Sequence, residues 1–267
     1  MAKTPAKKTA SKQSRAVAPA NTGSVPAAIA AQMKQDAGKG VSTAQEDNLV
    51  PLIYVLQPLS PQVEKGNDAQ IEGAEPGSIW LKNAPEPIVD GEEGILFQPC
   101  SFQKNWVEWI PRDNGGGLVG ITEDCPKEAK EEKDGNVIKY VMPNGNEVKE
   151  TRYHYGFVHI GNERLPYCIP LTSTGHTVSR DLMSRMRSKH LPDGTPAPSW
   201  AYLYRLKSVR KQNKKGTWYQ FTIEDHGWVE TADDYNLGKA LYQSLERGEK
   251  RAALDDNDVG GEPDGSM

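Results

Sequence analysis

The amino-acid sequence predicts a mainly β fold with one or two peripheral helices, placed between two unstructured tails. Short apolar runs with alternating polarity recur through the middle of the chain, and turn residues separate them. The 25 glycines and 19 prolines among 267 residues favour turns over long helices. Both ends of the chain are polar and lack apolar periodicity. We therefore expect one domain over residues 46–250, between tails at 1–45 and 251–267.

The two tails carry charges of opposite sign. All charged side chains before residue 20 are basic, and this N-terminal tail should be disordered, with at most a short helix near 27–34. After Leu254 the charged residues are all acidic. Such a tail can recruit basic partner surfaces, imitate a nucleic acid in competition for a cationic groove, or serve solubility alone. Its acidic residues are Asp255, Asp256, Asp258, Glu262 and Asp264.

The ordered domain should begin at Asn48, just before residues 49–56, the densest apolar run of the chain. Strand signals follow in three runs, at 79–81, 94–97 and 102–110. In a regular strand successive side chains point to opposite faces, so Trp106 and Trp109 should lie on opposite sides of the third run.

Glu and Lys dominate residues 123–150, where Asp134-Gly135 and Asn144-Gly145 signal turns. We expect this stretch to form an exposed hairpin excursion from the domain. Strands should resume at 153–160 and 167–171.

Two helices are expected in the second half of the domain. The first should follow Thr174 and Thr177 and end at Pro192, because apolar residues recur at every fourth position between them. The second should start where Thr231 and Asp234 can form a cap, and end at Gly248. The recurring apolar residues are Val178, Leu182 and Met186 in the first helix and Leu237, Leu241 and Leu245 in the second.

The clearest supersecondary signal lies between these helices. Residues 202–209 alternate in polarity, the polar stretch 210–216 is typical of a turn, and 217–223 returns as a partner strand. We expect a β-hairpin here. Trp218 and Phe221 should belong to the core, whereas Tyr204 and Tyr219 are the better candidates for exposed rings.

No motif indicates catalysis, and we expect a protein without catalytic residues, cofactor or metal. The five histidines have no metal-ligand spacing, and the three cysteines are odd in number and widely spaced, which favours reduced thiols. Gly115-Gly116-Gly117 lacks the Lys-Ser/Thr of a phosphate-binding loop, and no serine lies in a nucleophile elbow. No apolar run approaches the roughly 20 residues that cross a bilayer, so we expect no membrane partner and a place inside the cell.

Single-stranded nucleic acids present a polyanionic backbone and flat base faces, so a protein that binds them needs cations beside aromatic rings. The predicted hairpin interleaves both residue types. The alternative is that the rings belong to the core and the lysines to an ordinary solvated turn. The candidate nucleic-acid-binding residues are Tyr204, Arg205, Lys207, Lys211, Lys214, Lys215, Tyr219 and Trp106, with Arg112, Arg185 and Arg187 as further candidates.

The stretches Tyr202–Ser208 and Asn213–Phe221, followed by the acidic tail, resemble the single-stranded DNA-binding proteins of tailed bacteriophages. Residues 48–61 and 106–112 are similar to uncharacterised phage early proteins. The resemblance implies an OB-like β-barrel that coats and protects single-stranded DNA in phage replication or recombination, without sequence specificity. It also implies the cytoplasm of an infected bacterial host cell as the location, and replication or recombination proteins as partners of the acidic tail.

Two other functions stay open. A virion or assembly protein would use the same aromatic residues for subunit contacts, and a host-takeover protein would bind a host enzyme through the acidic tail. RNA is an alternative ligand, because DNA and RNA both offer phosphates and base faces. A homo-oligomer is also compatible with the sequence.

Overall fold

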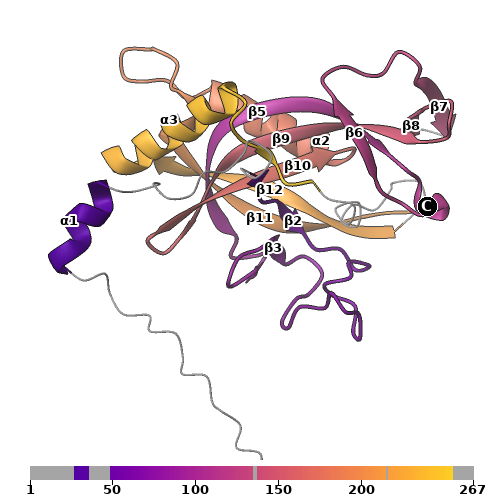
Figure 1. Cartoon of the computed structure of the whole chain (residues 1–267), viewed down its shortest axis with the longest axis horizontal. Helices are drawn as coiled ribbons and strands as arrows, with labels where there is room; N and C mark the ends of the chain where they lie inside the picture. The colour runs from indigo at the N-terminus through magenta and orange to yellow at the C-terminus, as the bar shows by residue number, and fades with distance from the viewer. Residues whose placement is uncertain (1–26, 36–48, 135–136, 215, 255–267) are drawn as a thin grey trace, which may run out of the picture. The chain divides into compact units, whose positions relative to one another are not determined.

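The computed structural model describes residues 27–35, 49–134, 137–214 and 216–254 (Figure 1). The chain divides into two compact units, 1–42 and 43–267. The first contains α1 (Ala27–Gln35), at the place where the sequence admitted a short helix. The rest of the predicted N-terminal tail, and the acidic residues after Leu254, lie outside the described residues.

The second unit is predominantly β, as predicted. Its largest sheet has the order β12-β11-β5-β9-β8-β7, with β10 paired to β9 and β6 paired to β5. All of these pairings are antiparallel. The strands are β5 (Ile95–Trp109), β6 (Leu118–Thr122), β7 (Lys130–Asp134), β8 (Val137–Val141), β9 (Glu147–Ile160), β10 (Glu163–Thr172), β11 (Tyr202–Asn213) and β12 (Gly216–Trp228).

The described part of this unit also contains two smaller sheets, two α-helices and two short 3-10 helices. The helices α2 (Gly175–Arg187) and α3 (Ala232–Glu246) begin at their predicted positions; α3 ends close to Gly248 as predicted, whereas α2 ends at Arg187, before the predicted end at Pro192. The Thr231 hydroxyl caps α3 by accepting from the Asp234 N–H at 3.0 Å. None of the described helices has the length and apolar character needed to span a bilayer. The small sheets are β2 (Ile53–Val55), β3 (Ile79–Leu81) and β4 (Ile88–Val89), and the parallel pair β1 (Leu49–Val50) and β13 (Arg251–Ala252).

The pairing of β13 with β1 is a difference from the sequence prediction. Residues 251–252 were assigned to the acidic tail, but Arg251 pairs with Leu49 and Ala252 with Val50. The short strand is basic and apolar rather than acidic, and the Ala253 N–H donates to the Val50 carbonyl at 2.9 Å. Backbone pairing therefore continues past residue 250.

Strand β5 is continuous, although the sequence predicted two separate runs within it. Pro99 interrupts the apolar pattern, and the register against β9 shifts between Pro99 and Ser101. A β-bulge is one of the few places where proline is tolerated inside a sheet, because a ladder hydrogen bond is already lost there. Gly156 lies opposite Pro99, where a Cβ would come within 2.3 Å of the Gln98 carbonyl oxygen. The close approach of the two backbones therefore requires glycine at this position.

The predicted closed barrel is wrong, because the described strands do not close into one. β10 meets the segment before β2 through a single parallel bridge between Leu52 and Cys168. At the other end of the main sheet, β12 pairs with no strand other than β11 in the described chain. β2 could have filled this position, but it is three residues long and pairs with β3. The prolines on either side, Pro51 and Pro58, keep it short.

Two apolar clusters form the interior of this unit. The first joins the β2–β3–β4 sheet to β5, β10, β11, β12 and α2, and the second joins β1, β5, β9 and α3. Gln98 is completely buried and positions α3, because its Nε2 donates to the carbonyls of Trp200 at 2.8 Å and Asp234 at 3.0 Å. Gly238 of α3 lies so close to Trp200 that a Cβ would come within 2.7 Å of it.

Candidate nucleic-acid interface

Strands β11 and β12 form the predicted hairpin, but the strands are longer and the turn is shorter than expected. Residues 210–213, predicted as part of the turn, continue β11 and pair with 216–219. The side-chain oxygen Oδ1 of Asn213 accepts a hydrogen bond from the Gly216 N–H at 3.1 Å and helps to close the turn. Arg210 and Lys211 are therefore held on a strand, whereas Lys214 lies in the turn.

The register gives the hairpin two distinct faces. Leu206 pairs with Ile223 and both are buried in the first apolar cluster. On the opposite face Lys207 pairs with Thr222, and Lys211 pairs with Trp218. Side chains of directly paired residues point to the same side of a sheet, with Cβ atoms about 5 Å apart. The side chains of Lys211 and Trp218 are therefore neighbours.

Tyr204 is not a stacking platform. Its side chain is 0% exposed, because it lies on the same face as Leu206 and belongs to the first apolar cluster. Burial raises the pKa of its hydroxyl, and the hydroxyl oxygen has no hydrogen-bond partner among the described residues. Strand alternation placed this ring on the correct face, but the expectation that the face was exposed is wrong.

The remaining rings of the hairpin differ in their exposure. Phe221 is buried, as predicted. Tyr219 is half-buried and packs against the first cluster, with its ring so close to Gly77 that a Cβ there would lie 2.7 Å away. Trp218 was expected in the core but is also half-buried. Its Nε1 has no exposed surface, so the part of Trp218 that meets solvent is apolar ring.

The candidate cations of the hairpin fall into two groups. Glu224 compensates Lys207, since the Lys207 Nζ lies 3.1 Å from a Glu224 carboxylate oxygen, and Glu224 is also the direct partner of Arg205. Lys211 and Lys214 are exposed and have no acidic partner within the described part of the chain. Lys215 lies outside the described residues. No Asp or Glu occurs in the sequence between Asp193 and Glu224, so the tip of the hairpin is free of acidic residues.

The arginines of α2 are engaged differently. Arg185 lies 3.1 Å from Asp181 and 3.0 Å from Asp225 of β12, and these hydrogen bonds raise its pKa. Lys189 also bonds to Asp225, and this contact is the main reason that the pKa of Asp225 is lowered. The ion pairs join α2 to β12 and compensate the charge of Arg185. Arg187 is exposed on the last turn of α2.

Trp106 and Arg112 are not brought to the hairpin by any described contact. Trp106 is half-buried on β5, where it pairs with Thr122 and Glu150, and its ring meets Tyr140 edge-on at a centroid distance of 5.1 Å. β11 contacts β5 by pairing only at Ile95–Phe97, at the other end of that strand. Arg112 begins a short 3-10 helix after β5 (Arg112–Asn114).

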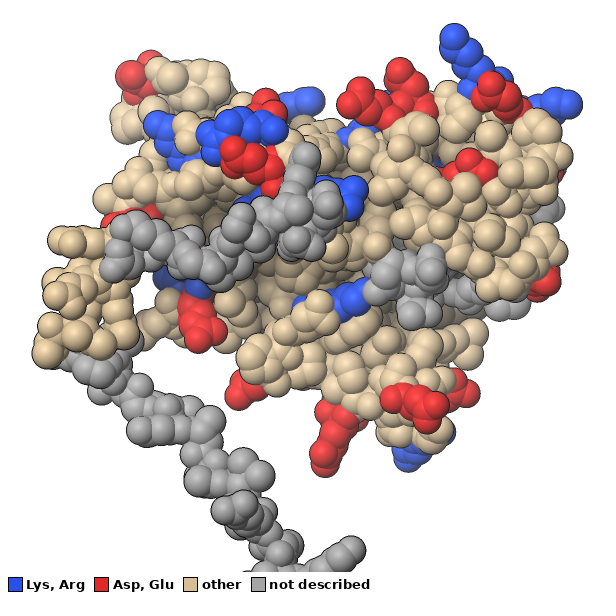
Figure 2. All heavy atoms as spheres, in the orientation of Figure 1, with Lys and Arg blue, Asp and Glu red and all other residues tan. Residues whose placement is uncertain are grey.

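The face of the molecule shown in Figure 2 carries Lys and Arg side chains scattered among Asp and Glu, with uncharged surface between them. It shows no broad area of one sign. The acid-free tip of the hairpin is the best candidate for a cationic site among the described residues, because no carboxylate follows Asp193 in the sequence before Glu224.

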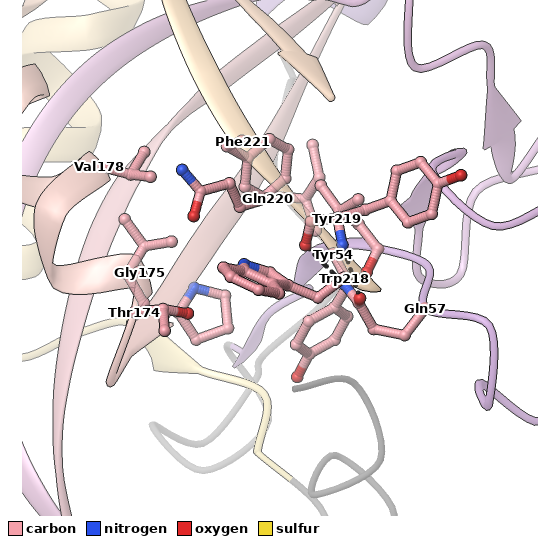
Figure 3. Close-up of a pocket in the computed structure, with 13 residues that line it drawn as sticks. Tyr54, Gln57, Thr174, Gly175, Val178, Trp218, Tyr219, Gln220 and Phe221 are labelled. Atoms are coloured by element: carbon pink, nitrogen blue, oxygen red, sulfur yellow. Dashed lines mark hydrogen bonds between the residues drawn. The ribbon is translucent and has the colours of Figure 1, made fainter. Parts of the chain in front are cut away.

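A hollow lies beside the hairpin, where β12 lacks a neighbouring strand (Figure 3). We call it the seam hollow. It is open to solvent, and the space in it that the centre of a water molecule can occupy is about 40 Å³. β2, the end of β10, the start of α2 and β12 form its walls. The residues that matter for its chemistry are Tyr54, Gln57, Thr174, Val178, Trp218 and Gln220.

The described residues hold no group of three or more His, Cys, Asp or Glu side chains that could bind a metal ion. His154 and Ser179 form a hydrogen bond of 2.8 Å between Nε2 and Oγ, but both are 0% exposed. Burial lowers the pKa of His154 to about 3. Cys100 and Cys168 are also buried, and burial raises the pKa of both thiols, which makes them poor nucleophiles.

Comparison with known proteins gives one match. A family model described as "Pam3 phage gp34-like protein" matches residues 20–251, which include α1 and nearly all of the described second unit. No curated protein and no solved structure matches the chain.

Proposed function

The chain belongs to the Pam3 phage gp34-like family and is a phage protein, and we propose that it binds single-stranded DNA through the tip of the β11–β12 hairpin. In this proposal it coats and protects the strand during phage replication or recombination. Binding depends on the phosphate backbone and on base stacking, and is not sequence-specific. The acidic tail would contact replication or recombination proteins.

One observation supports the proposal above all others. Lys211 and Lys214 are exposed, without acidic partners in the described chain, on a hairpin whose sequence contains no acidic residue from 194 to 223. Trp218, the direct partner of Lys211, presents ring surface on the same face. Cations that neutralise phosphates, next to a ring on which a base can stack, are the combination that single-strand binding requires.

The proposal is tested with a fluorescent oligonucleotide, titrated at several salt concentrations with the wild type and the Lys211→Ala/Lys214→Ala variant. Each phosphate contact contributes about −0.7 to the slope of log affinity against log salt for a single strand. We expect the variant to bind more weakly at low salt, with a slope that is less steep by about 1.4. Fluorescence anisotropy measures both quantities.

The matched control is Lys65→Ala/Lys127→Ala, which removes two exposed lysines far from the hairpin in sequence and changes the net charge equally. It should leave the slope unchanged. Equal losses in both variants would show that net charge alone governs binding. If the folded wild type does not bind at low salt, the proposal is wrong.

A second function, a structural role in phage assembly, is favoured by one observation. Val119 and Ile121 of β6 are 50% and 45% exposed, on a strand that pairs only with β5 in the described structure. Exposed apolar residues on an edge strand are typical of protein–protein contacts. Large oligomers that persist on dilution, together with no affinity for DNA, would favour this function. Light scattering over a range of concentrations measures the first property.

A further inference from the structure

The seam hollow is held in shape by Gln57. The Gln57 side chain takes the place of a neighbouring strand at Tyr219: Oε1 accepts from the Tyr219 N–H at 2.9 Å, and Nε2 donates to the Tyr219 carbonyl at 2.8 Å. Nε2 also donates to the Val55 carbonyl at 3.1 Å. Both the oxygen and the nitrogen of the Gln57 amide therefore have hydrogen-bond partners. These bonds fix the edge of β12, and the space beside that edge stays open.

The ring of Trp218 forms one wall of this hollow. Trp218 is half-buried, while its polar Nε1 has no exposed surface. The surface that it offers is therefore flat and apolar. In Figure 3 the ring extends from β12 toward Thr174 and Gly175, at the start of α2. A planar aromatic group that enters from solvent can stack on such a surface.

Gln220 supplies the polar group beside this ring. It is two residues from Trp218 on β12, so both side chains lie on the same face of the strand. Figure 3 shows its amide directed toward Val178. Unlike Gln57, Gln220 makes no side-chain hydrogen bond to the described residues. A free amide offers one acceptor and two donor hydrogens, which match the edges of nucleobases.

We propose that the seam hollow accepts one base of the bound strand, stacked on Trp218 and hydrogen-bonded to the amide of Gln220. Lys211, opposite Trp218 in the register, is placed to contact a phosphate next to that base. The inference rests on the proposed function and goes further, because it assigns one base to the seam hollow and names Gln220 as its hydrogen-bond partner.

The test compares two oligonucleotides of equal length and charge, one with normal bases and one in which every nucleotide is abasic. Wild type should bind the first more tightly. Trp218→Ala should weaken binding of the base-containing strand at least about fivefold and leave binding of the abasic strand unchanged. Gln220→Ala should act in the same direction with a smaller effect, and it keeps the test decisive if Trp218→Ala does not fold. Thermal melting checks the fold of each variant.

Two control variants lie on the same hairpin. Trp228→Ala removes a tryptophan that is 45% exposed at the far end of β12, and Gln212→Ala removes an exposed amide near the tip. Both should bind either strand like wild type. If wild type binds both strands equally, the proposed base site is wrong, and binding through the phosphate backbone remains supported. If the folded protein binds neither strand, both proposals are wrong. An equal effect of Trp218→Ala on both strands also overturns the base site.

Discussion

Two buried tyrosines, Tyr167 and Tyr204, differ in whether the hydroxyl has a hydrogen-bond partner among the described residues. The Tyr167 hydroxyl donates a hydrogen bond to the Lys82 carbonyl at 3.1 Å. The Tyr204 hydroxyl, equally enclosed, has no partner among the described residues. A buried polar group without a partner loses its hydrogen bonds to water and gains none in return. Comparing these two residues therefore measures how much a buried hydroxyl changes the free energy of unfolding with and without a hydrogen-bond partner.

We expect Tyr204→Phe to leave the free energy of unfolding unchanged or to raise it by about 1 kcal/mol, because it removes an unpaired polar group. Tyr167→Phe should lower the free energy by about 1 kcal/mol, because it leaves the Lys82 carbonyl without its donor. Urea denaturation of both variants measures the difference. A loss in Tyr204→Phe as large as in Tyr167→Phe would mean that the Tyr204 hydroxyl is satisfied.

His154 makes the stability depend on pH. Its pKa in the folded protein is about 3, because burial disfavours the charged form and Arg152 adds repulsion. In the unfolded chain its pKa should be near 6.5. Below that value the unfolded chain takes up a proton that the folded protein cannot. Stability should therefore fall as the pH falls from about 6.5 toward 3, by up to about 1.4 kcal/mol per pH unit from this residue.

His154→Gln removes this titration, so its free energy of unfolding should fall less steeply between pH 6 and pH 4.5, even if the variant is less stable at pH 7. The matched control is His190→Gln, at an exposed position, which should keep the steeper slope. Urea titrations at four pH values give the slopes. Identical slopes in wild type and His154→Gln would contradict a neutral buried imidazole.

At the scale of elements, local sequence signals predicted most of the fold. The alternation of polarity and the turn residues predicted the hairpin. Apolar residues at every fourth position predicted α2 and α3, and the Thr231 cap marked the start of α3. These signals work because strand and helix periodicities are properties of the local chain. The same signals wrongly predicted two separate strands where β5 is continuous. The bulge at Pro99 is defined by the register against β9, and the local sequence of β5 does not reveal that register.

The edge of β12 depends on one side chain from the loop after β2, distant in the sequence. Gln57 makes three hydrogen bonds to Tyr219 and Val55. Gln57→Ala should lower the free energy of unfolding by roughly 2–4 kcal/mol, because it leaves both backbone groups of Tyr219 without their partner. Faster hydrogen exchange of the Tyr219 amide would locate the effect. The control is Gln70→Ala, which removes one exposed hydrogen bond from the Gly66 N–H and should lower the free energy of unfolding by less than about 0.5 kcal/mol. If Gln57→Ala and Gln70→Ala lower it equally, Gln57 does not have the proposed role.

At the scale of the whole molecule, charge is distributed unevenly along the chain. Removing residues 255–267 deletes five acidic side chains and no basic ones, so the formal net charge changes from −4 to +1. If the acidic tail competes with DNA for the hairpin, the shortened protein should bind an oligonucleotide several-fold more tightly at low salt. The advantage should disappear at high salt, because screening weakens both interactions.

A full-length variant with all five acidic residues replaced by Asn or Gln serves as the control for this deletion. It keeps the length of the tail, so it should match the truncated protein if charge is responsible. Anisotropy at two salt concentrations measures both proteins. Equal affinity of the full-length and truncated proteins at low salt would show that the tail does not compete for the binding surface.

The sequence by itself determined the β-rich class, the positions of the helices and the hairpin, and the acid-free run of cations at its tip, because all of these follow from residues close together in the chain. The tertiary structure alone decided which side chains meet solvent. Tyr204 is enclosed because it belongs to the first apolar cluster, to which residues distant in the sequence contribute, and Lys207 is compensated because Glu224 lies beside it. The open seam beside Trp218 exists because β2 is too short to complete the sheet. Exposure and ion pairing depend on residues that are distant in the sequence and meet only when the elements pack together.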